Sequence, residues 1–478
     1  MMLFTVQALG CKVNQYDAQA VAAELRRAGL ADAPAGRVPD LVVVSTCCVT
    51  RAAMRKSRQA VRRAVRSAPS AAVLVTGCYG DYDPRAVRSA LAEAAGAPHA
   101  CAVAGYHGDL ASRVRQFVER LRRGAACAPP EPGAPARGSP ADIASRRLAA
   151  VKAAAPGAAA LPPIDSFANH QRAFVKVQDG CDAFCSYCVV PYTRPVVRWR
   201  PVETVLAECR RLVAAGHREI VLCGVFLGAY GQPTAVRRRW RRRGRLVELL
   251  RGVAGIDGLW RVRLSSLEPL DVDDELLAAL RDLPAAAPHL HLPLQSGSDR
   301  VLRRMNRQYG AGDYLRTVER LRRALDRPAV TADVIVGFPG EGEADFRATL
   351  DAARRAGLAR IHAFPFSAME GTAAWRWRAE GPPPQVVRRR MAELAAVARD
   401  LGAAFRRQFV GETMEALVER GRGQSGLRRA MTDRYLTVTF AAPPRRRLTG
   451  QIVRLRIDAA GAEGLSGELA KARQDVRR

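Results

Sequence analysis

Apolar runs and helical patterns alternate three times in the first 125 residues of the chain. The runs Phe4–Leu9, Leu41–Val44 and Val73–Val75 each end at a short polar segment, and a stretch with one apolar face follows each run. Strands that alternate with helices predict a parallel sheet. In such a sheet the loops that follow the strands share one edge. We therefore expect an N-terminal parallel-sheet α/β domain over residues 1–125 whose strand-end loops lie close together.

The same alternation returns between residues 167 and 405. The strand candidates there are Phe174–Gln178, Glu219–Gly224, Arg261–Ser265, His289–Leu294, Ala332–Gly337 and Arg360–Phe364. Helical patterns separate the first five candidates and follow the fifth, at about 202–215, 245–253, 272–282, 299–326 and 342–356. Six β/α units are too few for a closed eight-stranded barrel. We therefore predict a central partial (β/α)6 barrel, which keeps the chain in the α/β class.

The last part of the chain has a different pattern. Between residues 406 and 460 apolar residues alternate with polar ones, as in Leu436–Phe440 and Val453–Ile457. A period of two predicts half-buried antiparallel strands, and a small barrel rich in arginine is typical of RNA-binding modules. Residues 126–166 are rich in Ala, Pro and Gly and are interpreted as a linker, and residues 461–478 as a dispensable tail.

The charge and the cysteine content of the chain indicate its class of binding partner and its cellular compartment. The chain has 76 Lys and Arg against 46 Asp and Glu, a formal charge of +30, and this excess predicts a nucleic-acid partner. No apolar stretch is long enough to span a bilayer, and the N-terminus does not resemble a signal peptide. The cysteine count is 11, an odd number, which argues against a disulfide framework. We expect a cytoplasmic protein without a membrane partner.

Three cysteines directly follow the first strand of the predicted partial barrel. They are Cys181, Cys185 and Cys188, in the spacing Cys-x3-Cys-x2-Cys. A closed zinc site needs four protein ligands, and ferredoxin-type clusters use four cysteines in other spacings. Three thiolates on a four-iron cluster leave one iron free to bind another molecule. The spacing therefore predicts a catalytic iron–sulfur cluster.

A second group of cysteines is dispersed along the N-terminal domain. Cys11, Cys47 and Cys78 each follow one of the three predicted strands. A single buried cysteine is more often a small hydrophobic residue than a ligand. Three in the same position of a parallel sheet favour a shared metal or cluster site, and Cys48 is the weaker candidate beside Cys47.

Longer motifs now allow the chain to be identified as similar to the radical S-adenosylmethionine methylthiotransferase family. The segments that carry the resemblance are LGCKVNQYD (9–17), STCCVT (45–50), TGC (76–78), FCSYCVVPYTR (184–194), LSSLEP (264–269), HLPLQSGS (291–298), MNR (305–307), DVIVGFPGE (333–341), FPFS (364–367), EGT (370–372) and TDRYL (432–436). The last of these resembles the RNA-binding TRAM domain. The resemblance covers almost the whole chain outside the linker, an arginine-rich segment and the tail.

The resemblance implies an activity, cofactors and partners. The segment around Cys11 is similar to the MtaB-type branch, which adds a methylthio group to C2 of N6-threonylcarbamoyladenosine beside the anticodon of tRNA. It implies two 4Fe–4S clusters, a radical cluster on Cys181, Cys185 and Cys188 and an auxiliary one on Cys11, Cys47 and Cys78. It also implies S-adenosyl-L-methionine as cofactor, the anticodon stem-loop as substrate, and an electron donor such as flavodoxin or ferredoxin. We expect a monomer.

The resemblance further suggests contacts for S-adenosylmethionine on the rim of the barrel. These candidates are Tyr187, Gly224, Ser266, Glu268, Gln295 and Gly337. Each has a structural alternative, because a glycine can serve only a turn and Glu268 can serve only a structural hydrogen bond.

The sequence departs from the family pattern just after the cluster loop. Arg194 is followed by Pro195 where the family usually has Gly, and Val197 and Trp199 occupy positions that usually hold Glu and Ser. Phe226 stands where the branch often has His, and Cys223 replaces a usual Thr. None of these changes removes a cluster ligand, but they affect substrate positioning.

An arginine-rich segment, 236–245, follows the second strand of the predicted barrel. A run of charge is often only a solvated loop. Its functional interpretation is a phosphate-binding arm in which Trp240 stacks on a base.

Three other functions stay open at this point. Two use the same chemistry on isopentenyladenosine in tRNA or on an aspartate of a ribosomal protein, and the third is a non-catalytic iron–sulfur protein that binds RNA.

Overall fold

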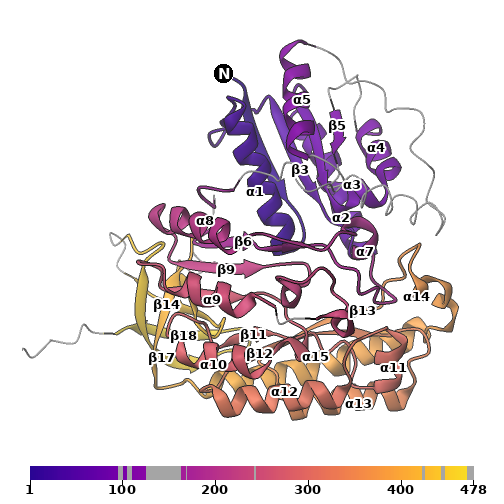
Figure 1. The fold of residues 1–478 in the computed structure, drawn as a ribbon, viewed down its shortest axis with the longest axis vertical. Coiled ribbons are helices and arrows are strands. Elements are labelled where there is room, and N and C mark those ends of the chain that lie inside the picture. Colours follow the sequence, from indigo (N-terminus) through magenta and orange to yellow (C-terminus); the bar gives the residue numbers. More distant parts are fainter. Residues whose placement is uncertain are drawn as a thin grey trace, which may run out of the picture.

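The computed structural model describes residues 1–94, 101–104, 110–124, 163–167, 170–241, 244–421, 426–442 and 447–470. Most of the predicted linker, including Cys127, lies outside these residues, as do positions 471–478 of the predicted tail. Figure 1 shows the N-terminal domain on one side of the central barrel.

The N-terminal domain has one parallel sheet with the strand order β2-β1-β3-β4-β5. Its strands are β1 (Leu3–Ala8), β2 (Ala31–Asp32), β3 (Leu41–Thr46), β4 (Ala72–Gly77) and β5 (Cys101–Ala104). Its helices are α1 (Lys12–Arg27), α2 (Arg51–Ser67), α3 (Cys78–Tyr82), α4 (Pro84–Ala92) and α5 (Leu110–Arg122). The predicted parallel-sheet domain is confirmed, and β2 and β5 are additions that the apolar pattern did not reveal.

Helices cover both faces of this sheet. Strands β3 and β4 are buried at every position, as expected for central strands of a parallel sheet. Helices α1 and α5 pack on one face through Leu25 and Phe117, and α2 and α4 pack on the other through Val61 and Val87. The strand-end loops therefore form an edge of the sheet that these helices do not cover.

The central part forms two three-stranded parallel sheets, ordered β10-β9-β6 and β11-β12-β13. Their strands are β6 (Arg172–Lys176), β9 (Glu219–Cys223), β10 (Arg261–Leu264), β11 (His289–His291), β12 (Ala329–Val336) and β13 (Arg360–Pro365). A bridge between Ser266 and His291 joins the two sheets. A short hairpin, β7 (Gln178–Asp179) and β8 (Arg198–Trp199), brackets the cluster loop and the short helix α7 (Val190–Thr193). The predicted six-stranded partial barrel is confirmed.

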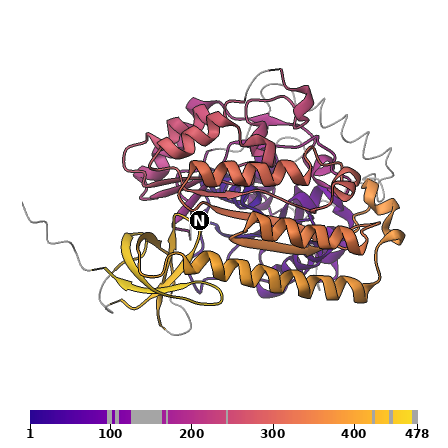
Figure 2. The ribbon, with the colours of Figure 1, turned by 90° about the horizontal axis from the view of Figure 1, so that it is seen from below.

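Helices pack around the outside of this barrel. They are α8 (Val202–Ala214), α9 (Leu246–Ala254), α10 (Asp274–Asp282), α11 (Asp299–Arg304), α12 (Ala311–Ala324), α13 (Glu343–Ala356), α14 (Ala373–Arg376) and α15 (Pro384–Arg407). Short 3-10 turns occur at η1 (Leu227–Ala229), η2 (Arg237–Arg239), η3 (Pro269–Asp271) and η4 (Arg378–Glu380). The helical pattern predicted over 299–326 is split into α11 and α12, because Asn306 adopts a left-handed φ of 57°. Figure 2 shows α12, α13 and α15 side by side.

The C-terminal part is a closed five-stranded barrel in the order β14-β15-β16-β18-β17. Its strands are β14 (Thr413–Val418), β15 (Arg428–Thr432), β16 (Thr437–Phe440), β17 (Ile452–Ala460) and β18 (Leu465–Leu469). The small closed barrel is as expected, but it is not antiparallel throughout, because β16 and β18 pair in parallel. The tail predicted from residue 461 is wrong at its start. Strand β18 pairs with both β16 and β17 and buries Leu465, so it closes the barrel.

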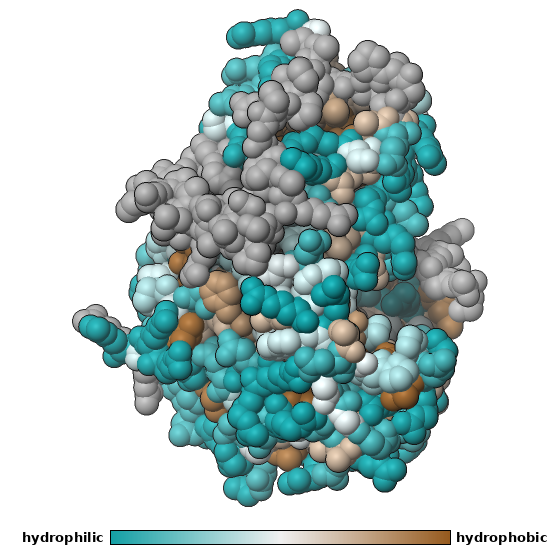
Figure 3. Space-filling model, turned by 90° about the vertical axis from the view of Figure 1, so that its right-hand side faces the viewer, coloured by the Kyte–Doolittle hydropathy of each residue, from teal (hydrophilic) through white to brown (hydrophobic). Residues whose placement is uncertain are grey.

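Hydrophobic residues are scattered among hydrophilic ones on the face shown in Figure 3. Within the described residues, no helix has the length and apolar character needed to cross a bilayer.

Candidate functional site

The cluster loop presents three cysteine sulfurs, each of which accepts an N–H. The backbone N–H groups of Ala183 and Val190 donate to the sulfurs of Cys181 and Cys188 at 3.5 Å and 3.4 Å. The third sulfur, that of Cys185, accepts from Nη1 of Arg307 at 3.1 Å. Hydrogen bonds to cysteine sulfur stabilise the thiolate and tune a bound cluster. The loop is therefore arranged to hold three thiolates.

The segment Met305–Arg307 fixes the shape of the cluster loop. The side-chain amide of Asn306 donates to the carbonyls of Ala183 and Phe184 at 3.0 Å and 2.9 Å. Phe184 itself has a left-handed φ of 50°, an uncommon conformation for a bulky residue. These hydrogen bonds stabilise that conformation. The segment Met305–Arg307, for which the sequence alone indicates no role, therefore supports the cluster loop.

Arg307 connects the cluster loop to the rim of the barrel. Its guanidinium donates to Cys185, to Oη of Tyr187 at 3.3 Å and to the carboxylate of Glu268. Both members of the Arg307–Glu268 ion pair are largely buried. No feature of the sequence pattern predicted this role, because the two ends of the ion pair are far apart in the chain.

Burial favours the protonated thiol of Cys181 and Cys188. It raises the pKa of Cys188 to about 12 and that of Cys181 well above its ordinary value, with Cys185 as the next cause in each. A bound cation would reverse this, because metal binding requires and favours the thiolate. The site is therefore expected to bind its metal with release of protons.

The second group of cysteines gathers at the free edge of the N-terminal sheet. Cys11 precedes α1 and is exposed, Cys47 follows β3 and is buried, and Cys78 begins α3. Gly10 has a φ of +92°, and a Cβ there would lie 2.8 Å from the sulfur of Cys47. Only glycine therefore lets the loop carrying Cys11 approach Cys47.

The electrostatic interactions among these three thiols are consistent with their proximity. Burial raises the pKa of Cys47 to about 12, and the charges of Cys78 and Cys11 add to the shift. The pKa of Cys78 is also raised by burial, although Arg194 opposes the change. The topology thus brings together the strand-end cysteines that the sequence singled out, and the buried Cys48 lies beside them.

Arg194 links the two groups of cysteines. From the end of the cluster loop its Nε donates to the sulfur of Cys78 at 3.3 Å. Its remaining nitrogens bind Asp179 at 2.7 Å and the fully buried Asp17 of α1 at 2.6 Å. The charge of Cys78 also contributes to the raised pKa of Cys188, behind burial and the nearer Cys185. The two candidate centres are adjacent across the interface between the domains.

The rim candidates occupy different environments. Gly224 follows β9, and a Cβ there would fall 2.9 Å from Oε1 of Gln178. Ser266 is exposed at the junction of the two sheets. Gln295 has a left-handed φ of 61° and is buried. Gly337 has a φ of 79° and would meet Val387 of α15 if it carried a Cβ, and this contact favours its structural interpretation.

Several buried polar atoms on this rim have no partner among the described residues. They are Oε1 of Gln295, Oγ of Ser265 and Nε of Arg307. An unpaired buried polar group costs about 1–3 kcal/mol, so these atoms fit a site completed by a polar cofactor. Within the same residues, no set of three His, Cys, Asp or Glu side chains is arranged for a single metal ion.

Two of the departures from the family pattern share one apolar cluster. Val197 and Phe226 pack against the buried alanines Ala183, Ala229 and Ala235, as do Trp240 and Cys181. Pro195 is buried, whereas Trp199 is exposed. Val197 and Phe226 are therefore part of one apolar cluster, which also includes a cluster cysteine.

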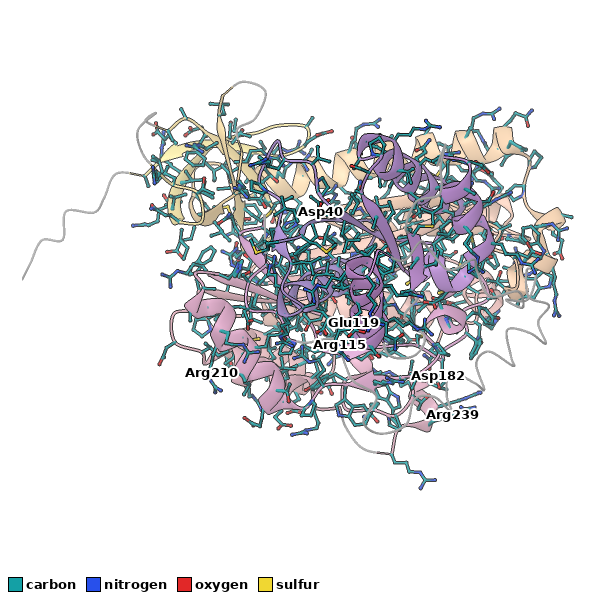
Figure 4. The ribbon with its side chains drawn as sticks, turned by 90° about the horizontal axis from the view of Figure 1, so that it is seen from above. Asp40, Arg115, Glu119, Asp182, Arg210 and Arg239 are labelled. Carbon is teal, nitrogen blue, oxygen red and sulfur yellow. The ribbon has the colours of Figure 1, made fainter. Side chains whose placement is uncertain are left out.

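The arginine-rich segment has both internal and exposed members. Arg237 binds the buried carboxylate of Asp271 at 2.5 Å and covers the ring of Trp240, whose indole N–H donates to the Thr234 carbonyl. Arg239 lies on the same side of the molecule as Asp182 of the cluster loop (Figure 4). Trp240 is thus engaged within the protein, whereas Arg238, Arg239 and Arg241 are exposed.

Comparisons with known proteins identify the family. The radical SAM superfamily matches residues 175–353, and the family described as uncharacterized protein family UPF0004 matches residues 3–96. The chain is 34% identical to a threonylcarbamoyladenosine tRNA methylthiotransferase MtaB of Chlamydia pneumoniae over 98% of each protein. It is 30% identical to the MtaB protein of Bacillus subtilis over 98% of this chain and 96% of that protein.

Solved structures confirm the fold. The radical S-adenosylmethionine methyltransferase TsrM of Kitasatospora setae, solved with cobalamin and a 4Fe–4S cluster, superposes with a TM-score of 0.54 over 78% of this chain and 76% of that one. The two share 15% sequence identity, so this likeness concerns the fold. The chain is a radical S-adenosylmethionine enzyme whose cofactors are S-adenosylmethionine and 4Fe–4S clusters. It belongs to the MtaB-type radical S-adenosylmethionine methylthiotransferase family.

Proposed function

We propose that this enzyme adds a methylthio group to C2 of N6-threonylcarbamoyladenosine next to the anticodon of tRNA. The observation that carries the proposal is the pair of adjacent cysteine groups joined through Arg194. A single group would suffice to generate a radical, and a second group beside it supplies a place for sulfur. The names of the relatives support the threonylcarbamoyl substrate.

We assign the two clusters to the two cysteine groups. Cys181, Cys185 and Cys188 hold the radical cluster, and Cys11, Cys47 and Cys78 hold the auxiliary cluster. Gln295 and Glu268, with Tyr187 and Gly224, contribute to the S-adenosylmethionine site. When bound, these cofactors supply a carbon radical that can attack an aromatic C–H, which has no acidic proton for ordinary acid–base catalysis.

The residues of the chain orient and shield this chemistry. Arg307 holds Cys185 and Glu268 in place, and Arg194 fixes the position of Cys78 relative to the cluster loop. The apolar cluster that Val197, Phe226 and Trp240 form with the buried alanines also contains Cys181, and its apolar surroundings limit access of water to a cluster bound there. The C-terminal barrel and the overall positive charge favour binding of the RNA backbone.

Nucleoside mass spectrometry tests the proposal. Transfer RNA from a strain that lacks the enzyme should lose 2-methylthio-N6-threonylcarbamoyladenosine and accumulate its unthiolated parent. Loss of the isopentenyl counterpart instead would contradict the substrate. Purified, anaerobically reconstituted enzyme should also release 5′-deoxyadenosine from S-adenosylmethionine under reducing conditions, and absence of this product would contradict the enzymatic role itself.

A further inference from the structure

Helix α2 of the N-terminal domain has a strongly basic outer face. Its sequence contains six Arg and one Lys, and no Asp or Glu. The side of the helix that packs on the sheet is small and apolar, with Ala60, Val61 and Val65 buried there. The cations therefore lie on the opposite side. Five of them are exposed and are called the α2 face: Arg51, Arg55, Lys56, Arg63 and Arg66.

The charge of the α2 face is not neutralised within the described part of the chain. The two other cations of the helix have partners, because Arg62 binds Glu93 at 2.5 Å and Arg58 donates to Oη of Tyr79 at 2.6 Å. The five exposed cations form no ion pair with the described residues. Like charges one turn apart on a helix repel each other. An anionic partner along this face would relieve that repulsion.

The far end of the α2 face borders a hollow in the surface. Helices α2 and α4 pack side by side on the same face of the sheet (Figure 1). The hollow beside them has a volume of about 860 Å³. It is lined by Gln59, Arg62, Arg63, Arg66, Ser67 and Glu93. The carboxylate among these residues is already bound to Arg62. The hollow therefore presents the guanidinium groups of Arg63 and Arg66, whose planar shape matches a phosphate group.

The near end of the α2 face lies at the rim of the central barrel. Helix α2 begins four residues after Cys47. The backbone N–H of Arg51 donates to Oγ of Ser367 at 3.0 Å, and Ser367 follows β13 at its carboxyl end. At about 1.5 Å of rise per residue, the face extends for roughly 22 Å from Arg51 to Arg66. A long anion bound along α2 would thus lead directly to the candidate site.

The composition of the α2 face favours a nucleic acid over a protein or a membrane. Protein interfaces are anchored by large apolar or aromatic side chains, and interfacial helices enter membranes through such side chains. None of the exposed large apolar residues in the described part of the chain belongs to α2. They are Met1, Val38, Val49, Trp199, Phe364 and Val410. Cations without apolar anchors are typical of contacts to a phosphate backbone.

We propose that the α2 face binds the phosphate backbone of the anticodon stem and so holds the tRNA while its loop enters the candidate site. This inference rests on the proposed function, which supplies tRNA as the partner. The modified nucleotide lies in the loop at the rim, so the phosphates that reach Arg63 and Arg66 belong to the stem. Contacts of this kind position the RNA and do not read its bases.

The test replaces Arg55, Arg63 and Arg66 by Gln in the full-length reconstituted holoenzyme. Two RNAs carry the same threonylcarbamoyladenosine: the complete anticodon stem-loop, and a single strand of the loop nucleotides alone. Fluorescence anisotropy at several salt concentrations gives each Kd. Each phosphate contact contributes roughly 0.7–0.9 to the slope of log affinity against log salt. We expect the slope for the stem-loop to fall by up to about 2–3 and its Kd to rise by at least about 10-fold, with less than about 2-fold change for the single strand.

A matched control removes the same charge from the other side of the same sheet. Arg113, Arg120 and Arg123 are exposed on α5 or directly after it, and α5 packs on the face of the sheet opposite to α2. Their replacement by Gln should leave the Kd and the slope for both RNAs close to the wild-type values. Circular dichroism and iron content report whether both variants fold and assemble their cofactors.

The outcomes separate this inference from the proposed function. A wild-type enzyme that does not bind the stem-loop overturns both. If the wild type binds it and the α2 and α5 variants behave alike, only the role of the α2 face is overturned. An α2 variant that weakens both RNAs equally has the same consequence, because the contact would then be with the loop. An α2 variant that keeps its RNA affinity but is reduced more slowly by flavodoxin would assign the face to a protein electron donor, which also overturns the inference.

Discussion

At the scale of single residues, some features of the site can be predicted from the sequence and others cannot. The cysteines could be predicted because their spacing and their positions after strands are local properties of the chain. The role of Arg307 could not, because it depends on how distant segments meet: Arg307 contacts a loop more than a hundred residues earlier. The clustering of Val197, Phe226 and Trp240 likewise appears only in the fold.

Replacement of Arg307 tests the support of the cluster loop. Arg307→Met removes a donor to Cys185 and leaves the mostly buried carboxylate of Glu268 without its partner. The loss of one member of a buried pair costs about 3–5 kcal/mol. We expect the free energy of unfolding of the anaerobic holoenzyme, measured with urea, to fall by that amount.

The control for Arg307 is a surface ion pair. Arg316→Met breaks the ion pair between Arg316, whose side chain is 69% exposed, and Asp313. This change should lower the free energy of unfolding by about 0–1 kcal/mol. The double variant Arg307→Met/Glu268→Gln should recover part of the lost stability. Equal losses for Arg307→Met and Arg316→Met would contradict the supporting role of Arg307.

At the scale of elements, periodicity located the strands of the two α/β parts but not all of their boundaries. The helical pattern over 299–326 did not reveal the break at Asn306, because the left-handed residue there is required by the cluster loop and not by local sequence. The sequence does not distinguish strand β18 from a tail, because its short segment lacks a clear alternation and depends on pairing with β16 and β17.

Truncation tests whether β18 closes the C-terminal barrel. Removal of residues 461–478 leaves the edges of β16 and β17 unpaired and removes the buried Leu465. We expect this variant to lose the protease resistance of residues 413–460 and at least 10-fold in affinity for the stem-loop RNA. Removal of only residues 471–478 keeps all five strands and serves as the control. Similar behaviour of the two truncations would contradict the role of β18.

The arginine-rich segment gives a prediction about salt dependence. Arg238, Arg239 and Arg241 are exposed, whereas Arg237 is bound to Asp271. Each phosphate contact on RNA contributes roughly 0.7–0.9 to the slope of log affinity against log salt. Replacement of the three exposed arginines by Gln should therefore reduce this slope by up to about 2–3 in stem-loop binding titrations.

A charge-matched variant provides the comparison for this segment. Arg316, Arg323 and Arg347 are exposed on α12 and α13, on the outside of the barrel. Their replacement by Gln removes the same charge and should leave the slope nearly unchanged. If both triple variants lower the slope equally, the segment acts only through net charge.

At the scale of the whole molecule, the C-terminal barrel docks against the end of the central barrel opposite the candidate clusters. Arg263 donates to the backbone carbonyls of Asp433 and Thr432 at 2.8 Å and 3.2 Å. Tyr435 adopts a left-handed φ of 61° and stacks on His289. The family resemblance indicated which domains are present, but the sequence does not encode this contact in any local pattern.

A buried carboxylate holds this contact together. Glu219, the first residue of β9, is fully buried and binds Arg261 at 3.2 Å and Arg263 at 3.1 Å. Burial acts to raise the pKa of Glu219, but the guanidinium groups of Arg263, Arg261 and Arg172 outweigh it and hold the pKa below its ordinary value. A carboxylate whose pKa is depressed on folding contributes stability above its unfolded pKa, about 4.3 for Glu, and loses it as the pH falls further.

Glu219→Gln should therefore remove a pH-dependent part of the stability. We expect the wild-type protein to exceed the variant in urea midpoint at pH 5–7, where the carboxylate is ionised, and this difference to shrink as the pH falls below about 4. Circular dichroism under anaerobic conditions measures the midpoints, and Glu319→Gln, in an exposed pair with Arg323, is the control. A difference that stays constant with pH would mean that Glu219 acts through packing alone. The docking of the C-terminal barrel would then not depend on this charge.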